Sequence, residues 1–262
     1  MELEQLFNNL LNFNVDLMEN NIEVFNNDEM VEVLEEYATK YEIHVERFFD
    51  AMYLQPREDF VKDKNLVIKD GSNQLYNFAY PASISKEFDT LSNPGKNVNF
   101  NFSLLTPSQV YTFLYLLNPH PNEKICELRT NEGYFTGLLS RLSKEVVSVQ
   151  PNYQVDGLAK KNLKKYGQEI KNVKILEKEE SYDLMFSKNY SNLFDKVVAC
   201  GSLLSEDESE LTHLINSNGK IVAPYYNFNT NFSDLFLYKN TSFKLYKFEV
   251  FDSMFFPPFI SQ

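Results

Sequence analysis

The sequence predicts an α/β fold, with a doubly wound, mainly parallel sheet of seven strands that follows an N-terminal helical segment. Three observations lead to this prediction. Between Lys124 and Pro224, short apolar runs alternate with amphipathic runs of helical period, a pattern typical of parallel sheets. Two further strand-like runs follow, close enough in sequence to form an antiparallel pair. Apolar residues recur at helical spacing in the first part of the chain.

The N-terminal segment is predicted to contain three helices. The first two cover residues 2–13 and 28–42, and the Asn-rich stretch 12–27 between them is expected to be irregular in part. A third helix, residues 43–52, should end near Pro56, because a residue that precedes proline avoids the helical region.

A polar stretch separates these helices from the sheet. Residues 58–103 are expected to form a long excursion with short strands. Thr106 and Pro107 then begin a helix, with threonine as its cap and proline at its first position. The sequence therefore divides into an N-terminal helical and irregular segment, residues 1–103, and an α/β domain, residues 104–262.

The α/β domain is predicted to alternate strands and helices in chain order. The expected strands are 124–128, 146–149, 173–177, 196–199 and 220–224, the helices are 134–142, 153–166 and 207–216, and a closing antiparallel pair is 235–239 and 242–249.

The composition narrows the possible partners and compartment. A net charge of −12 argues against nucleic acid or an anionic membrane surface as the main partner, since both need a cationic field. Cys126 and Cys200 fall in predicted buried strands, as core cysteines of a reducing compartment do. No run approaches the roughly 20 apolar residues of a membrane span. The acidic start matches no signal or transit peptide, so cytoplasmic residence is the default expectation, with an organelle or a large intracellular assembly left open.

The segment Ile125–Phe135 has the pattern strand, loop and helix, where nucleotide-binding α/β folds place a glycine-rich turn. Such turns use glycines at alternate positions, so that the backbone can turn tightly and approach a ligand. Here the strand carries Glu127, and the alternate positions after it are Arg129, Asn131 and Gly133. Only the third is glycine.

With this loop, an ordered set of segments resembles the protein-L-isoaspartate O-methyltransferases, which use S-adenosylmethionine. The resemblance runs from about residue 40 to the end and implies a Rossmann-like methyltransferase sheet. It includes a Pro-Arg-Glu-x-Phe-Val signature at Pro56–Val61, a second strand at Val146–Gln150 and a fourth strand at Phe194–Gly201. In addition, Ser-Asn-Gly-Lys-Ile-Val-Ala-Pro at Ser217–Pro224 resembles the family's Gly-Gly-x-Leu-x-x-Pro strand entry, and Phe-Phe-Pro-Pro at Phe255–Pro258 resembles its C-terminal Arg-Phe-Val-Pro.

The resemblance assigns cofactor positions to particular residues. Glu127 matches the carboxylate of the first strand, and Arg129 replaces a glycine where a long side chain would enter the space of the cofactor's methionine part. The alternative for Arg129 is a solvated side chain, or one that pairs with Glu127 or Glu132 and fills the vacant space. Asn131 is a milder change, since Asn tolerates left-handed backbone angles.

Two further positions concern the ribose and the adenine. Gln150 stands where the resemblance implies a carboxylate that accepts hydrogen bonds from both ribose hydroxyls. Replacing that carboxylate by a neutral glutamine would weaken ribose binding by about 1–2 kcal/mol. The alternative for Gln150 is a strand terminus before Pro151. Glu179 keeps the acidic type of the adenine position but belongs to a charged run, which by default is a solvated loop.

The methyl-acceptor side is also altered. The family carries an Ile-Ser-x-Pro motif whose serine helps to position the isoaspartyl carboxylate. Anchored on Pro107, that serine corresponds to Leu105, which cannot donate a hydrogen bond. A slip of one or two residues would instead bring Thr106 or Ser103 to this role.

No metal site is expected, because the three histidines have no metal-ligand spacing. Two functional hypotheses remain. The first is a catalytically inactive relative of the isoaspartyl methyltransferases that binds no cofactor and serves as a subunit of a larger assembly. Its partners would be other protein chains, contacted through the N-terminal helices, the excursion 63–102 and the aromatic C-terminus 248–262. The second is an active enzyme that uses S-adenosylmethionine.

Overall fold

The structure is a computed structural model in which the chain forms two compact units, residues 1–115 and 116–262. No helix among the described residues is long and apolar enough to cross a membrane. The described residues are 3–20, 22, 24, 26–60, 67–69, 75–77, 105–150, 157–166, 171–176, 184, 191–204, 211–241 and 244–254.

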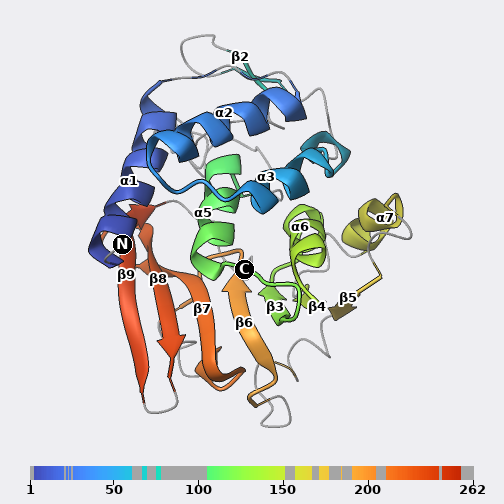
Figure 1. Cartoon of the computed structure of the whole chain (residues 1–262), viewed down its shortest axis with the longest axis vertical. Helices are drawn as coiled ribbons and strands as arrows, with labels where there is room; N and C mark the ends of the chain where they lie inside the picture. Colours follow the sequence, from blue (N-terminus) through green and yellow to red (C-terminus); the bar gives the residue numbers. More distant parts are fainter. Residues whose placement is uncertain are drawn as a thin grey trace. The chain divides into compact units, whose positions relative to one another are not determined.

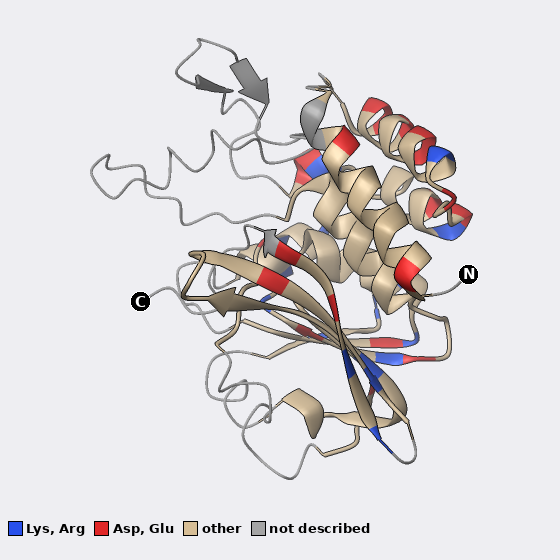
Figure 2. Cartoon of the chain, turned by 90° about the vertical axis from the view of Figure 1, so that its left-hand side faces the viewer, with Lys and Arg blue, Asp and Glu red and all other residues tan. Residues whose placement is uncertain are grey.

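The first unit is mainly helical, and its helices carry many acidic side chains (Figures 1 and 2). Its elements are α1 Leu3–Glu19, α2 Asn27–Lys40, α3 Glu46–Tyr53, a 3₁₀ turn Arg57–Asp59, the antiparallel pair β1 Val67–Lys69 and β2 Leu75–Asn77, and most of α5 Pro107–Leu117.

The core of the first unit is built around one aromatic side chain of α5. The Tyr111 ring stacks on Phe49 of α3, with 4.8 Å between ring centroids, and lies 5.4 Å from the Phe13 ring of α1. Its hydroxyl donates to the carbonyl oxygen of Ile43 at 2.7 Å. A buried tyrosine needs such a partner. These contacts tie α1, α3 and α5 into one core.

Two predicted boundaries in this unit were wrong. The first helix, predicted to end at residue 13, continues to Glu19. Within the added turns, Nδ2 of Asn14 donates to the carbonyl oxygen of Leu10 and to Oγ1 of Thr112. The third helix begins at Glu46 rather than at residue 43. The chain turns at Glu42, whose φ is 58°, and is extended at Val45 before α3 starts.

The second unit contains a seven-stranded sheet in the order β5-β4-β3-β6-β7-β8-β9, which confirms the predicted sheet (Figure 1). The first five strands of this order are parallel, and β7–β8 and β8–β9 are antiparallel. The elements are β3 Lys124–Leu128, α6 Tyr134–Leu142, β4 Glu145–Val149, α7 Leu158–Lys164, β5 Val173–Leu176, β6 Phe194–Ala199, β7 Ile215–Asn227, β8 Phe232–Asn240 and β9 Leu245–Met254.

The predicted helix over residues 207–216 was wrong at its C-terminal end. Only Leu211 and Thr212 are helical among its described residues, and β7 already begins at Ile215. Ile215 is buried and pairs with Phe194 of β6, so that burial in the sheet overrides the helical pattern. Of the predicted helix 153–166, α7 covers Leu158–Lys164 and follows Gly157, which has a left-handed conformation, and residues 153–156 lie outside the described residues.

Candidate functional site

The carboxyl group of Glu127 is fully buried near the end of β3. Its Oε2 accepts hydrogen bonds from Oγ1 of Thr136 on α6, at 2.5 Å, and from Oγ of Ser148 on β4, at 2.6 Å. Burial raises the pKa of Glu127 to about 7, although these hydrogen bonds and one from Cys200 act in the opposite direction. This carboxyl group therefore joins β3, β4 and α6.

The backbone of the following loop has left-handed conformations at all three expected glycine positions. The φ angles are 80° at Arg129, 49° at Asn131 and 87° at Gly133. A left-handed conformation costs a residue with a Cβ roughly 1–2 kcal/mol. The loop is held by the Val149 carbonyl oxygen, which accepts from the amides of Arg129 and Thr130 at 2.8 and 3.0 Å. The loop thus keeps the backbone conformation of a glycine-rich turn, although Arg129 and Asn131 adopt left-handed angles less readily than glycine does.

The side chains of this loop bond to one another and to the end of β4. Nε of Arg129 donates to Oδ1 of Asn131 at 2.9 Å, and the Asn131 amide donates to Oε1 of Gln150 at 2.8 Å. Gln150 is buried. Burial lowers the pKa of Arg129 to about 10, and the negative charge of Glu132 opposes this shift. Arg129, Asn131 and Gln150 therefore form one chain of hydrogen bonds.

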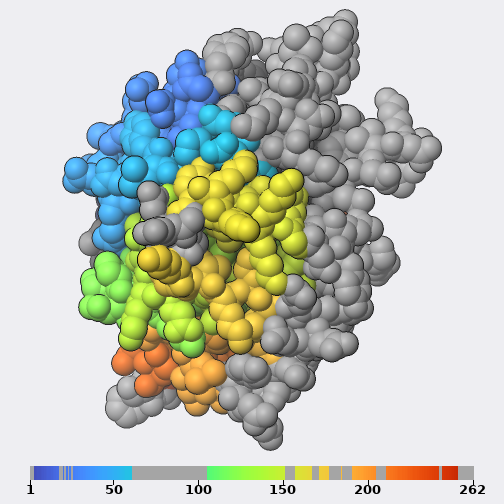
Figure 3. Space-filling model, turned by 90° about the vertical axis from the view of Figure 1, so that its right-hand side faces the viewer, coloured from blue at the N-terminus to red at the C-terminus, as the bar shows by residue number. Residues whose placement is uncertain are grey.

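Gly133, which begins α6, lies against α7. A Cβ added there would lie 3.2 Å from Cα and Cβ of Ala159 and 3.2 Å from Cγ of Leu163. Figure 3 shows α7 at the surface, in yellow. The close approach of a helix to the loop requires a glycine at this position, whether or not a ligand binds.

Two of the predicted acceptor residues, Leu105 and Thr106, are described and have structural partners in the first unit. The Thr106 amide donates to Oε1 of Gln109 at 2.9 Å, and the Gln109 amide donates to Oγ1 of Thr106 at 3.2 Å. This reciprocal pair is a capping box, which confirms the predicted start of α5. The carbonyl oxygen of Leu105 accepts from Nη2 of the buried Arg57.

Four of the predicted cofactor residues lie together at the carboxyl ends of β3 and β4, beside Gly133. They are Glu127, Arg129, Asn131 and Gln150. Ser103, Glu179 and the C-terminal motif 255–258 lie outside the described residues.

Thr136 and Ser148, the partners of Glu127, were missed from the sequence. A signal was available, since Ser148 is the one polar residue within the apolar run of β4. No cluster of three or more His, Cys, Asp or Glu side chains in the described part of the chain could hold a metal ion.

Sequence comparisons give one partial relative. No family model matches the chain. Over 109 residues the chain is 28% identical to a protein-L-isoaspartate O-methyltransferase of Methanoregula boonei. These residues are 42% of this chain and 47% of that protein, so the match spans less than half of either.

Structural comparisons cover more of the chain. One solved protein-L-isoaspartate O-methyltransferase superposes with a TM-score of 0.61 over 88% of this chain and 65% of its own length, at 17% identity. A structure assigned to the same activity, from Plasmodium falciparum and in complex with S-adenosyl-L-homocysteine, gives a TM-score of 0.56 over 89% and 98%, also at 17% identity. The chain therefore has a methyltransferase fold of the S-adenosylmethionine-dependent kind, similar to that of the protein-L-isoaspartate O-methyltransferases.

Proposed function

We propose that this protein is a catalytically inactive, isoaspartyl-methyltransferase-like subunit of a larger protein assembly. The observation that carries the proposal is the chain of hydrogen bonds from Arg129 through Asn131 to Gln150. A cofactor would need the ribose acceptor at the tip of β4 and the space above the loop backbone. Here the Gln150 oxygen already accepts from the loop, and Arg129 adds a long, charged side chain at the tightest turn.

The residues present therefore fit S-adenosylmethionine poorly. A neutral amide lacks the charge with which a carboxylate accepts two ribose hydroxyls, and charged acceptors form hydrogen bonds about twice as strong as neutral ones. To release Gln150, the cofactor would also have to leave the Asn131 amide without its partner, at a cost of about 1–3 kcal/mol.

The acceptor side supports the same proposal. The Thr106 hydroxyl, one candidate for positioning a substrate carboxylate, is used in the cap of α5 and also lies 3.2 Å from Oγ of Ser108. Leu105 has no side-chain hydrogen-bonding group. A substrate carboxylate would have to compete with the capping box for the same hydroxyl.

The second candidate function is an active, S-adenosylmethionine-dependent protein-L-isoaspartate O-methyltransferase. One observation favours it: the loop keeps its left-handed backbone at Arg129, Asn131 and Gly133. In this conformation, movement of the Gln150 side chain is enough to present the Asn131 amide to a ligand. The name of the Methanoregula boonei relative points to the same activity.

Calorimetric titration with S-adenosylmethionine separates the two candidates. We expect no binding to the natural chain at millimolar or lower concentrations. The variant Arg129→Gly/Asn131→Gly/Gln150→Glu restores two glycines and the carboxylate, and should bind measurably. Asn192→Gly, at another left-handed asparagine (φ 57°), is the matched control and should leave binding unchanged. Micromolar binding by the natural chain, or methyl transfer to an isoaspartyl peptide, would reject inactivity.

The subunit role predicts a partner interface on three segments, the last of which begins within the edge strand β9. We propose residues 1–45, 63–102 and 248–262, which together should bury at least roughly 1,000 Å² against another protein chain. Leu11 on α1 is 45% exposed and is one candidate contact. Most of residues 63–102 and all of 255–262 lie outside the described residues. Native mass spectrometry of protein from its own cell should show a complex, and a lone 30.7 kDa species would contradict the subunit role.

A further inference from the structure

Three lysines form a row across neighbouring strands of the second unit. Lys196 of β6 is the register partner of Lys220 on β7, and Lys220 is the register partner of Lys239 on β8. Register partners project from the same face of a sheet, and adjacent strands lie about 4.8 Å apart. Figure 2 shows basic segments, in blue, on several neighbouring strands. Like charges placed directly opposite each other destabilise a sheet.

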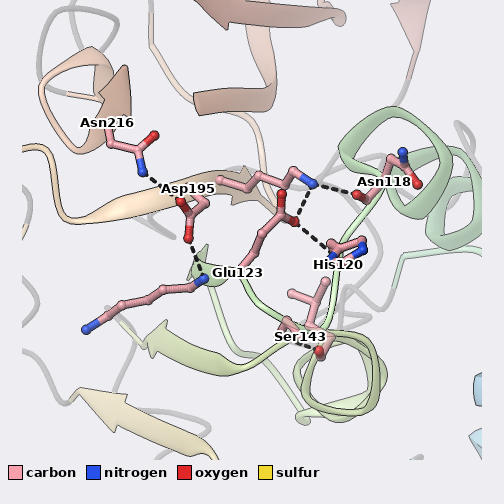
Figure 4. A network of polar contacts seen from close by, with 9 residues as sticks. Asn118, His120, Glu123, Ser143, Asp195 and Asn216 are labelled. Carbon is pink, nitrogen blue, oxygen red and sulfur yellow. Dashed lines mark hydrogen bonds and ion pairs between the residues drawn. The ribbon is translucent and has the colours of Figure 1, made fainter. Parts of the chain in front are cut away.

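Glu123 is a carboxylate bound to this lysine row. Nζ of Lys196, which is nearly buried, donates to Oε2 of Glu123 and to the carbonyl oxygen of Asn118 (Figure 4). Lys239 lies with its Nζ 5.8 Å from the centroid of the Phe248 ring. The three lysines and Glu123 together carry two excess positive charges, in a chain whose net charge is −12.

The central lysine has no counter-charge of its own. Within the part of the chain that the structure describes, the half-buried Lys220 ammonium forms no hydrogen bond or ion pair. Its pKa is lowered to about 8, first by burial and then by Lys196 and Lys239, while Glu123 acts in the opposite direction. Uncompensated, partly buried charge is costly, and a bound anion would remove that cost.

The other nearby carboxylates have different partners. Asp195 accepts from the Lys124 amide and from Nδ2 of Asn216, both at 2.7 Å (Figure 4). Glu145 pairs with Nζ of Lys124 at 2.9 Å. Neither carboxylate neutralises the lysine row.

We propose that Lys196, Lys220 and Lys239 bind a multiply charged oxyanion of the phosphate class. The Lys220 ammonium can donate to an oxygen of such an anion, and Lys196 and Lys239 on the adjacent strands add positive charge on either side of it. The half-buried position of Lys220 suits a small anion better than the acidic surface of a protein. The site is separate from the altered cofactor loop, because Lys196 pairs with Ile125 near the start of β3, whereas the loop follows the end of that strand.

Titration with inorganic phosphate at low ionic strength, followed by calorimetry and thermal unfolding, tests this site. We expect saturable binding and a rise in Tm, since a ligand that binds the native state stabilises it. Lys220→Met should weaken binding at least tenfold, because one of three charges is lost. Without phosphate, the same variant should melt no lower than the natural chain, since repulsion between lysines is relieved. Lys174→Met, at an exposed lysine of β5, is the matched control and should bind normally.

A second titration with ADP identifies the source of the phosphoryl group. Tighter binding of ADP than of phosphate, lost in Lys220→Met, supports a nucleotide-borne phosphoryl group. Equal binding supports the free anion. The proposal is overturned if phosphate stabilises the natural chain and Lys220→Met equally, or if sodium chloride at the same ionic strength reproduces the effect.

Discussion

The two ends of the parallel strands satisfy their polar groups in different ways. At the carboxyl end of β3 and β4, Glu127 has partners on α6 and β4, and Arg129, Asn131 and Gln150 bond to one another. At the amino end, Lys196 has a partner in Glu123, but Lys220 has none among the described residues. At the carboxyl end, where this fold class places its ligand, Arg129, Asn131 and Gln150 use one another as partners, and the uncompensated charge is at the other end.

This difference shows that a loop can keep the backbone conformation of a ligand-binding loop while the groups that would contact the ligand bond to one another. A ligand site needs groups that are held in place and yet left without internal partners. The loop at residues 129–133 keeps the first property, but its Arg129 and Asn131 side chains and the Asn131 amide have internal partners. The lysine row has surplus charge, which is what a site for an external anion requires. The difference can be tested one group at a time.

The largest expected effect is at the fully satisfied carboxyl group, Glu127. Its pKa is about 7 in the folded chain and has an ordinary value of 4.5. Because the folded state holds the proton more tightly, this group's contribution is complete below about pH 4.5 and is lost as the pH rises through 7. The loss is of order 3 kcal/mol.

Glu127→Gln keeps the shape but cannot ionise. We expect this variant to gain stability relative to the natural chain between pH 4.5 and 8, measured by urea unfolding at several pH values. A stability difference that does not change with pH would mean that Glu127 is not held in a low-dielectric site. The contrast between the two ends of the sheet would then be weaker.

The next largest effect is at Gly133. Gly133→Ala adds left-handed strain and a Cβ at 3.2 Å from α7, and should cost about 2–3 kcal/mol in the free energy of unfolding. Gly157→Ala is the matched control, because its φ is 77° but a Cβ there meets nothing within 4 Å. It should cost only about 1 kcal/mol. Equal costs, measured by chemical unfolding, would show that α7 yields and does not require the glycine.

The sheet could be predicted from the sequence because its parallel strands contain short runs of buried apolar residues, such as Val146–Val147 in β4 and Val197–Ala199 in β6. Boundaries failed where tertiary contacts decided them. Ile215 follows a helical pattern, yet pairing with Phe194 makes it the first residue of β7. Asn14 suggested a loop, but its side chain has two partners within the helical core.

The site was predictable in position but not in bonding. The strand–loop–helix pattern located Glu127, Arg129 and Gly133, since each follows from the order of elements. The partner of Gln150 did not follow, because a hydrogen bond between a loop amide and a side chain 19 residues away depends on the register of β3 and β4. The lysine row was invisible for the same reason, since it spans three strands that lie far apart in sequence.

The smallest expected effect is at Gln150. Gln150→Ala removes the acceptor of the Asn131 amide and should cost about 1 kcal/mol, the usual contribution of one such hydrogen bond. Gln150→Glu keeps an acceptor at the same place and should be at least as stable as the natural chain, since a charged acceptor forms a stronger hydrogen bond. Chemical unfolding of the three proteins measures both differences. If alanine costs nothing, the loop is not closed through Gln150, and the carboxyl end of the sheet has a group available for a ligand after all.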